Sequence, residues 1–152
     1  MLLLACLMME SVQRQERFRA WPLHLTLVPW FEVRSHNLLN LINSIEEVAK
    51  NLPRFKLTAD GTDYFDSRVK VTIVKPNESL IKLHQQLLNA LNSCDAKLIS
   101  DKYVGEHFKP HITNRGEKGP PRREIQCRRL YLVGKCENGD RQVVYSVNFQ
   151  EA

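Results

Sequence analysis

The chain of 152 residues has no long apolar run and only four cysteines, and both shortages narrow its class. The most apolar stretch, residues 1–9, is far too short to span a bilayer, and it has neither a positively charged start nor a small-residue cleavage pattern after it. We therefore expect an initial buried β-strand there, no membrane segment and a cytoplasmic protein. The cysteines form no C-x-x-C pair and no zinc-ligand spacing, so we expect free thiols in a reducing cytosol. They are Cys6, Cys94, Cys127 and Cys136.

Linkers, repeats and metal-ligand clusters are also lacking. No Gly/Ser-rich linker divides the chain and no solenoid repeat is evident, and 152 residues suit one compact domain. With 43% hydrophobic and 26% charged residues, the composition is that of a soluble globular protein rather than a disordered chain. The five histidines form no His-Asp-Glu cluster with ligand spacing, so we expect neither a metal nor another cofactor.

Positive charge is in excess and unevenly spread. The formal net charge is +5, which favours a polyanionic partner. Residues 114–129 hold six basic side chains and two acidic ones. A run of this kind is more often a solvated loop than a binding site, but its position directly after His111-Ile112-Thr113 favours contact with phosphate or RNA. The basic residues are Arg115, Lys118, Arg122, Arg123, Arg128 and Arg129.

Two segments have the apolar periodicity of helices. Residues 35–52 repeat apolar side chains at three- and four-residue steps, with Ser35 as a plausible N-cap and Pro53 as a stop. Residues 77–93 do the same, with Asn77 as the cap. A shorter and weaker helical pattern covers residues 10–19.

The remaining segments read as strands. Residues 23–28 and 108–113 are two of them, and residues 68–74 alternate apolar and polar side chains as a half-buried strand does. Residues 54–59 are expected to pair with 68–74 through a turn at 60–63. Near the end, Asn138-Gly139 between two strand-like runs, 130–136 and 142–149, is a strong hairpin signal. Strands interrupted by single helices predict an α+β domain with largely antiparallel sheets.

Two tripeptides of one form stand out, His24-Leu25-Thr26 and His111-Ile112-Thr113. Residues i and i+2 of a strand point to the same face, so each tripeptide presents an imidazole beside a hydroxyl. The same spacing places Arg115 on that face if its strand continues. Two such matches among five histidines arise by chance roughly once in a hundred chains of this composition. The competing interpretation is surface histidines beside threonines that merely favour strands.

These residue types suit phosphodiester cleavage without a metal. A base must take a proton from the attacking oxygen and an acid must give one to the leaving oxygen, and two imidazoles can do both near neutral pH. Hydroxyl donors and an arginine would hold the phosphoryl oxygens and stabilise their growing charge.

The stretches Leu23–Pro29 and Lys109–Thr113 resemble the paired motifs of the 2H phosphoesterase superfamily. This LigT-like superfamily includes RNA 2′,3′-cyclic phosphodiesterases, historically called 2′-5′ RNA ligases. The order of elements and the motif separation also resemble the family, so the likeness covers nearly the whole chain, although it is specific only at the motifs. Two departures are Asn114, where an apolar residue is usual, and the absence of helical periodicity in residues 114–126.

The resemblance implies a bilobal α+β fold over residues 1–152, with two pseudo-symmetric lobes whose antiparallel sheets form a central cleft and whose helices pack outside. It implies hydrolysis of a 2′,3′-cyclic phosphate of RNA or a nucleotide to a 2′-phosphate. His24 and His111 would be the acid–base pair, with His111 activating water and His24 protonating the leaving 3′-oxygen as the working assignment. Thr26 and Thr113 would bind the phosphate, and the strand spacing adds Arg115 to these phosphate-binding candidates. We expect a monomer.

Two alternatives stay open. The same residues could cleave 2′-5′ linked oligonucleotides or run the reverse ligation. A non-catalytic RNA-binding module could also retain the cleft, although a pure binder has no need of two titratable imidazoles.

Other side chains are weighed by position. RNA recognition needs a stacking aromatic, and Tyr64 and Phe65 are the candidates best placed to reach outward. Trp21 and Phe108 are expected to pack in the interior. Of the remaining histidines, His36 is expected at the surface, His84 as a packing residue and His107 as a lesser candidate for the cleft.

Overall fold

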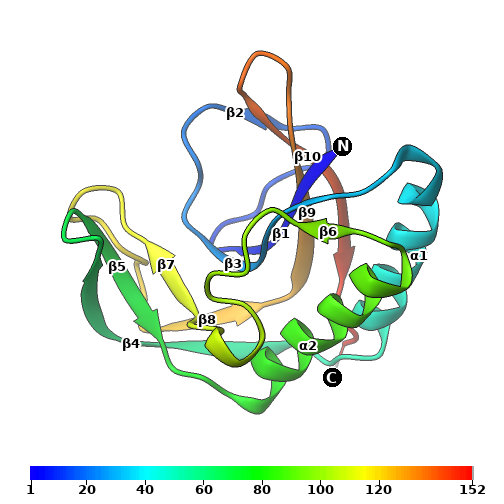
Figure 1. Ribbon diagram of the computed structural model, residues 1–152. Coiled ribbons are helices and arrows are strands. Elements are labelled where there is room, and N and C mark those ends of the chain that lie inside the picture. The colour runs from blue at the N-terminus through cyan, green and yellow to red at the C-terminus, as the bar shows by residue number, and fades with distance from the viewer. Residues whose placement is uncertain (152) are drawn as a thin grey trace.

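The computed structural model describes residues 1–151 and has ten strands, two α-helices and two short 3-10 turns within that range (Figure 1). The helices are α1 (Leu38–Lys50) and α2 (Glu78–Ser93), and the 3-10 turns are η1 (Ser35–Asn37) and η2 (Gly105–His107). The strands are β1 (Leu2–Met8), β2 (Arg17–Phe18), β3 (His24–Glu32), β4 (Phe55–Phe65), β5 (Val69–Val74), β6 (Lys97–Leu98), β7 (His111–Thr113), β8 (Glu124–Cys127), β9 (Arg129–Lys135) and β10 (Arg141–Asn148).

The strands form a single curled sheet in the order β2-β10-β9-β1-β3-β7-β5-β4-β8, with β6 added beside β3. All of its pairings are antiparallel. Its two halves meet where β3 and β7 pair through one couple of residues, Leu25 and Ile112. The predicted α+β class with antiparallel strands is therefore confirmed, and the two expected sheets are continuous through this narrow junction.

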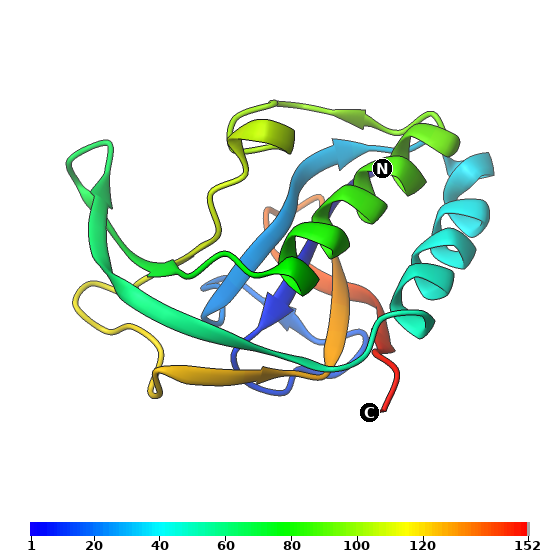
Figure 2. The ribbon, with the colours of Figure 1, turned by 90° about the horizontal axis from the view of Figure 1, so that it is seen from below.

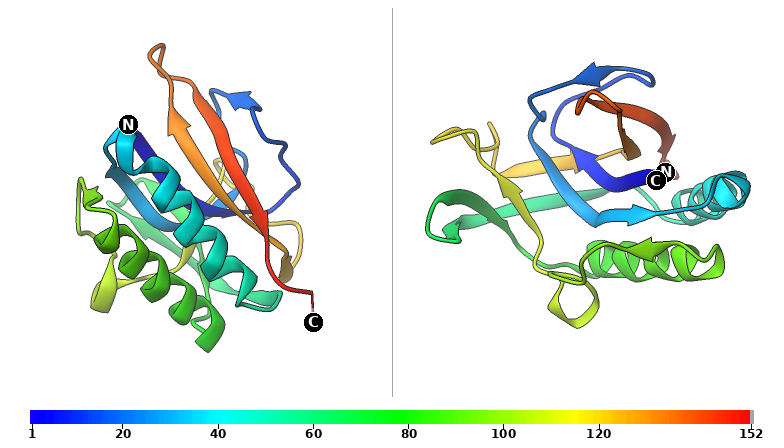
Figure 3. Two further views of the ribbon diagram at one scale, coloured as in Figure 1. Left: turned by 90° about the vertical axis from the view of Figure 1, so that its right-hand side faces the viewer. Right: turned by 45° about the horizontal axis from the view of Figure 1, so that its top comes forward.

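Both helices lie side by side on one face of the sheet (Figures 2 and 3). α2 begins as predicted at Asn77, whose side-chain oxygen accepts a hydrogen bond of 2.8 Å from the backbone N–H of Leu80. α1 begins later than its apolar pattern predicts. Ser35 starts the 3-10 turn η1 instead, and Asn37 holds the N-cap position without a side-chain bond.

Apolar side chains form two clusters on opposite faces of the sheet. The larger one fills the space between the helices and the sheet, and includes Leu25 and Ile112 at the junction. The smaller one lies over β1, β9 and β10. Its buried members are Leu4, Cys6, Met8, Val12, Tyr131, Val133 and Val143, with Phe18, Trp21 and Trp30 packed against them. Residues 1–9, including strand β1, thus supply both clusters, and the predicted buried first strand is confirmed.

The predicted helix over residues 10–19 is wrong. Apolar side chains occur there only at Val12 and Phe18, too few for the continuous stripe that stabilises a surface helix. The backbone bonds to the sheet instead. Gln15 donates to the carbonyl of Val143 and Val143 donates to that of Glu16, and β2 then pairs with β10.

Two other boundaries differ from the sequence expectation. β4 runs through the predicted turn, where Asp60 and Gly61 form a bulge with Gly61 at φ +86°, and the chain reverses instead at Asp66 and Ser67, both at positive φ. β3 continues past Pro29, which lies at a register shift between β3 and β1 where a strand tolerates a missing N–H. The hairpin of β9 and β10 forms as predicted.

Three further findings concern the described residues. None of the helices is long and apolar enough to cross a membrane. No three histidine, cysteine, aspartate or glutamate side chains of residues 1–151 gather as metal ligands would. The four cysteines are free, as predicted, and three of them are buried.

Candidate active site at the junction of β3 and β7

The pairing at the junction places the two His-x-Thr tripeptides against each other. Leu25 opposite Ile112 sets the antiparallel register, so His24 lies across from Thr113 and Thr26 across from His111. Leu25 and Ile112 are fully buried in the larger cluster, so their neighbours point to the other face of the sheet. Each imidazole therefore has a hydroxyl two residues away on its own strand and another across the pair.

Neighbouring strands confirm which face carries these side chains. Met8 and Cys6 on β1 lie opposite His24 and Thr26, and both belong to the smaller cluster. The four motif side chains therefore share the face that bears this cluster, away from the helices. His24, Thr26 and His111 are half-buried and Thr113 is exposed, so a ligand can reach all four. The two imidazoles lie diagonally across the strand pair, at a separation of roughly 7–8 Å between backbone positions.

Both imidazoles are held in the same way. Nδ1 of His24 lies 2.9 Å from the carbonyl oxygen of Pro22, and Nδ1 of His111 lies 2.7 Å from that of Lys109. A carbonyl only accepts hydrogen bonds, so Nδ1 carries the proton in each ring. This fixes the tautomer and leaves both Nε2 atoms as the positions that exchange protons with a ligand. The tether spans two residues in both motifs, because each histidine begins its strand.

Burial lowers the pKa of both histidines from the ordinary value, although the bond to the i−2 carbonyl opposes this. The positive charge of His111 further lowers the pKa of His24, and that of Lys109 lowers the pKa of His111. Protonation of one ring therefore disfavours protonation of the other. A pair that holds one proton has the base and the acid that phosphodiester chemistry requires.

The surroundings of the two histidines differ. Trp21 stacks on His24 with ring centroids 4.2 Å apart, and is itself in edge contact with Phe18 and Trp30. The rings beside His111 are Phe65, at 4.5 Å, and Tyr103, at 5.7 Å, which also contact each other. Trp21 is thus half-buried, and rather than packing beneath the strand it covers one catalytic candidate.

The Arg115 side chain contacts the backbone of the segment before the first motif. Its Nε and one terminal nitrogen donate to the carbonyl oxygen of Trp21 at 3.2 and 2.8 Å. The strand β7 ends at Thr113, and the chain turns at Arg115 through a bridge to Lys118, so Arg115 leaves the register of the motif face. The guanidinium remains exposed and fastens the segment that holds Trp21 over His24.

A cavity of about 180 Å³ opens beside His111 and Thr26. Its walls come from β3 and from the segment of residues 102–109 that precedes β7. They are Thr26, Leu27, Pro29, Lys102, Tyr103, Phe108, Lys109 and His111. The cavity therefore has a partly apolar lining and opens next to the motif face, as expected of a site for a small ring-shaped group.

His84 holds the segment of residues 102–109 against β3. Its Nδ1 lies 2.7 Å from the carbonyl oxygen of Leu27, and its Nε2 accepts from the backbone N–H of Gly105 at 2.9 Å. Its ring stacks on Phe108 at 3.9 Å, and only 1% of the side chain is exposed. The predicted packing role is confirmed, but His84 also bonds the strand of the first motif to the segment before the second.

The sequence comparison identifies the family at this point. The model of the 2′-5′ RNA ligase superfamily matches residues 9–130, which is most of the chain and includes both motifs. The chain belongs to the 2′-5′ RNA ligase superfamily. No individual curated protein matches it by sequence.

Several solved structures have the same fold as this chain. TT0787 of Thermus thermophilus is 19% identical, with a TM-score of 0.68 over 99% of both chains. Escherichia coli LigT in complex with NADP+ is 18% identical, with a TM-score of 0.67 over 97% of this chain and 96% of LigT. LigT in complex with 3′-AMP is also 18% identical, with a TM-score of 0.65 over the same shares. At these identities the likeness shows a LigT-like fold.

The other predicted site residues of this superfamily member are dispersed. Phe65 reaches His111, whereas its neighbour Tyr64 is 55% exposed. His36 lies at the surface as expected, and His107 ends the exposed turn η2 outside β7. Sequence reasoning missed Tyr103, which no strand or helix pattern connects to the motifs.

The basic run of residues 114–129 forms the loop after β7 and strand β8. Its two acidic members bind lysines outside the run: Glu117 pairs with Lys70, and Glu124 pairs with Lys56 at 3.8 Å. The six basic residues therefore keep their excess charge, and all of them but the half-buried Arg129 are exposed. These basic residues follow the chain from the loop after β7, past β8, to the first residue of β9.

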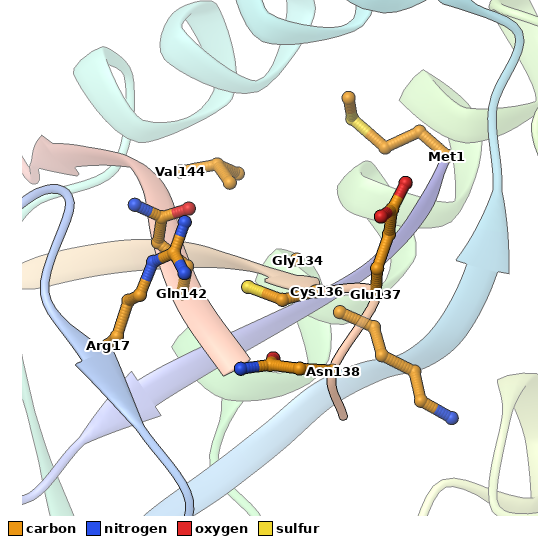
Figure 4. Close-up of a pocket in the computed structure, with 9 residues that line it drawn as sticks. Met1, Arg17, Gly134, Cys136, Glu137, Asn138, Gln142 and Val144 are labelled. Carbon is orange, nitrogen blue, oxygen red and sulfur yellow. The ribbon is translucent and has the colours of Figure 1, made fainter. Parts of the chain in front are cut away.

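A larger hollow of about 550 Å³ lies beside the β9–β10 hairpin, away from the motifs (Figure 4). Met1, Arg17, Cys136 and Gln142 are among its lining side chains, which project from separate elements around an open space. None of them belongs to either tripeptide. The hollow therefore has no part in the chemistry of the two motifs.

Proposed function

We propose that this superfamily member hydrolyses 2′,3′-cyclic phosphates of RNA or nucleotides to 2′-phosphates without a metal ion. The observation that carries the proposal is the register of β3 and β7, which pairs each histidine with the threonine of the other motif. Together with the matching Nδ1 tethers of His24 and His111, this gives two free Nε2 atoms on one face.

The proposed reaction uses both rings at once. One neutral Nε2 takes a proton from a water as the water oxygen attacks phosphorus. The bond from phosphorus to the 3′-oxygen breaks, and the protonated Nε2 of the other ring gives its proton to that oxygen. The product is a 2′-phosphate with a free 3′-hydroxyl, which holds the proton from the acid ring, while the base ring holds the proton taken from water. His111 as base and His24 as acid is the working assignment.

Thr26 and Thr113 are proposed to bind the phosphate. Each hydroxyl lies beside both imidazoles in the paired register. The two hydroxyls can therefore donate to the non-bridging phosphate oxygens, while the two imidazoles act on the attacking water oxygen and the leaving 3′-oxygen. Charge on these oxygens grows in the transition state, which makes such donors more effective there than in the ground state. We propose that Arg115 supports this site through Trp21 and the field of its exposed guanidinium.

The experiment is hydrolysis of the four nucleoside 2′,3′-cyclic monophosphates and of a short RNA with a cyclic phosphate end, in EDTA. We expect wild type to produce 2′-phosphates, and His24→Ala and His111→Ala each to lose roughly a hundredfold or more in kcat. His36→Ala, a change at an exposed histidine outside the site, should keep full activity. Full activity in either site variant would contradict the assignment of that histidine.

The family supports a second candidate, cleavage or formation of 2′-5′ linkages, because its model carries the name of that ligation. The same acid–base pair serves both reactions. If wild type is inert on cyclic phosphates, 2′-5′ linked oligonucleotides are the next substrates. Salt-sensitive RNA binding without any turnover would instead favour a non-catalytic binding module.

A further inference from the structure

The cavity beside His111 has features of a nucleobase site. Tyr103 and Phe108 contribute aromatic rings to its wall, and Leu27 and Pro29 contribute apolar surface. Lys102 and Lys109 stand at its rim, with their amino groups 5.2 Å from the ring centre of Tyr103 and 4.9 Å from that of Phe65. An apolar recess with aromatic walls and few polar groups binds flat heteroaromatic rings, while the two ammonium groups attract a nearby phosphate.

Tyr103 is held there in a backbone conformation that few side chains adopt. Its φ is +60°, in the left-handed region that is uncommon for residues other than glycine, asparagine and aspartate. The residues that follow Tyr103 are held by contacts with His84. Gly105 donates to His84, and Phe108 stacks on the same imidazole two residues before Pro110. The ring of Tyr103 is half-buried between Phe65 and the cavity, which fixes its orientation.

The other side of the junction is covered by an aromatic ring. Trp21 has one face on His24 and its edges against Phe18 and Trp30. On the opposite side, His111 and Thr26 both line the cavity at Tyr103. A phosphate bound at the motifs would therefore have this cavity beside it for its nucleoside.

We infer that this cavity receives the base of the nucleoside that carries the cyclic phosphate, with Tyr103 as its stacking residue. The inference rests on the proposed function and deepens it, since it names the part of the substrate that the His111 side of the junction binds. The ribose would bridge from the motif hydroxyls to the cavity, and Lys102 and Lys109 would lie near its phosphate. Tyr103 thus takes the role for which the sequence indicated Tyr64 and Phe65.

The test compares two substrates that differ only in the base. Adenosine 2′,3′-cyclic monophosphate has it, and 1,4-anhydroribitol 2,3-cyclic phosphate keeps the ring and the phosphate without it. We expect Tyr103→Ala to lower kcat/KM for the nucleotide by roughly 5- to 100-fold, mainly through KM, as for loss of one base–aromatic stack. Its activity on the abasic compound should change less than about twofold, on the same reasoning. Tyr103→Phe should restore the nucleotide value.

A matched control is Ile99→Ala, because Ile99 is 62% exposed just before the segment and lines no part of the cavity. It should leave both substrates unchanged. An equal loss on both substrates in Tyr103→Ala would show a merely structural role and overturn the inference. So would a nucleotide value that does not change.

Failure of the proposed function is separable from failure of this inference. If wild type hydrolyses neither compound, calorimetric binding of adenosine 2′-monophosphate and of the corresponding abasic phosphate replaces turnover. Tighter binding of the nucleotide by wild type, lost in Tyr103→Ala and kept in Tyr103→Phe, would support the base site without the reaction. Equal binding of both compounds by wild type would overturn it.

Discussion

The two halves of the site share their chemistry and differ in their walls. His24 and His111 are tethered alike, each to the carbonyl two residues before it. His24 then lies under Trp21, against the smaller apolar cluster, while His111 faces a cavity between Phe65 and Tyr103. A repeated tripeptide therefore builds the symmetric part of the site, and unrelated segments make one side closed and the other open.

The threonines test the symmetric part and should show the largest effect after the two histidines themselves. The β3–β7 register gives Thr26 and Thr113 equivalent places, so Thr26→Val and Thr113→Val should each lower kcat/KM by roughly 10- to 100-fold, as for one lost hydrogen bond to a charged group. Valine keeps the shape and strand preference of threonine, so stability should change little. The measurement is steady-state hydrolysis of one cyclic nucleotide. Losses that differ by more than about tenfold would break the equivalence, since that is about 1.4 kcal/mol.

Trp21 tests the closed side. Burial is the main cause of the lowered pKa of His24, so Trp21→Leu should raise that pKa toward its ordinary value. One limb of the pH profile of kcat/KM, which reports the free enzyme, should then move to higher pH while the other limb keeps its place. The activity at the optimum should fall only several-fold, as expected for a group that does not itself transfer a proton. A profile that shifts as a whole, or not at all, would contradict separate environments.

Arg115 provides the companion variant. Its guanidinium binds the carbonyl of Trp21, so Arg115→Ala should produce a smaller shift of the same limb than Trp21→Leu. Lys109→Ala is the contrasting change. Because the charge of Lys109 lowers the pKa of His111, its removal should move the other limb of the pH profile.

His84 tests the open side through stability and should show the smallest effect on turnover. Its pKa is lowered by burial, so between that value and about 6.5 the unfolded chain binds a proton that the folded chain does not. The free energy of unfolding therefore rises with pH through this window. His84→Phe should flatten that rise and cost about 1–3 kcal/mol at neutral pH, because the Gly105 N–H and the Leu27 carbonyl lose their partner.

Urea unfolding at several pH values measures this effect. His36→Gln is the control, since His36 is exposed and should leave the slope unchanged. A slope in His84→Phe that equals that of wild type would show that the remaining buried histidines account for the pH dependence.

The motifs and most elements could be predicted from the sequence because their information is local. The strand period placed each threonine beside its histidine, and Asn77 carried its own cap signal. What could not be predicted depends on contacts between distant segments. The bulge at Gly61 looked like a turn, and residues 10–19 are held by β10 rather than by their own pattern. The pairing of Leu25 with Ile112 and the place of Tyr103 arise only when the sheet curls.

The central claim is that His24 and His111 act as one acid–base unit on a phosphodiester. The most direct test is kcat for a 2′,3′-cyclic nucleotide, in EDTA, for His24→Ala, His111→Ala and the double variant. Groups that act together lose their effect together, so the double variant should lie within about tenfold of the weaker single variant. If the two losses multiply in the double variant, the histidines act independently, and the paired acid–base account is wrong.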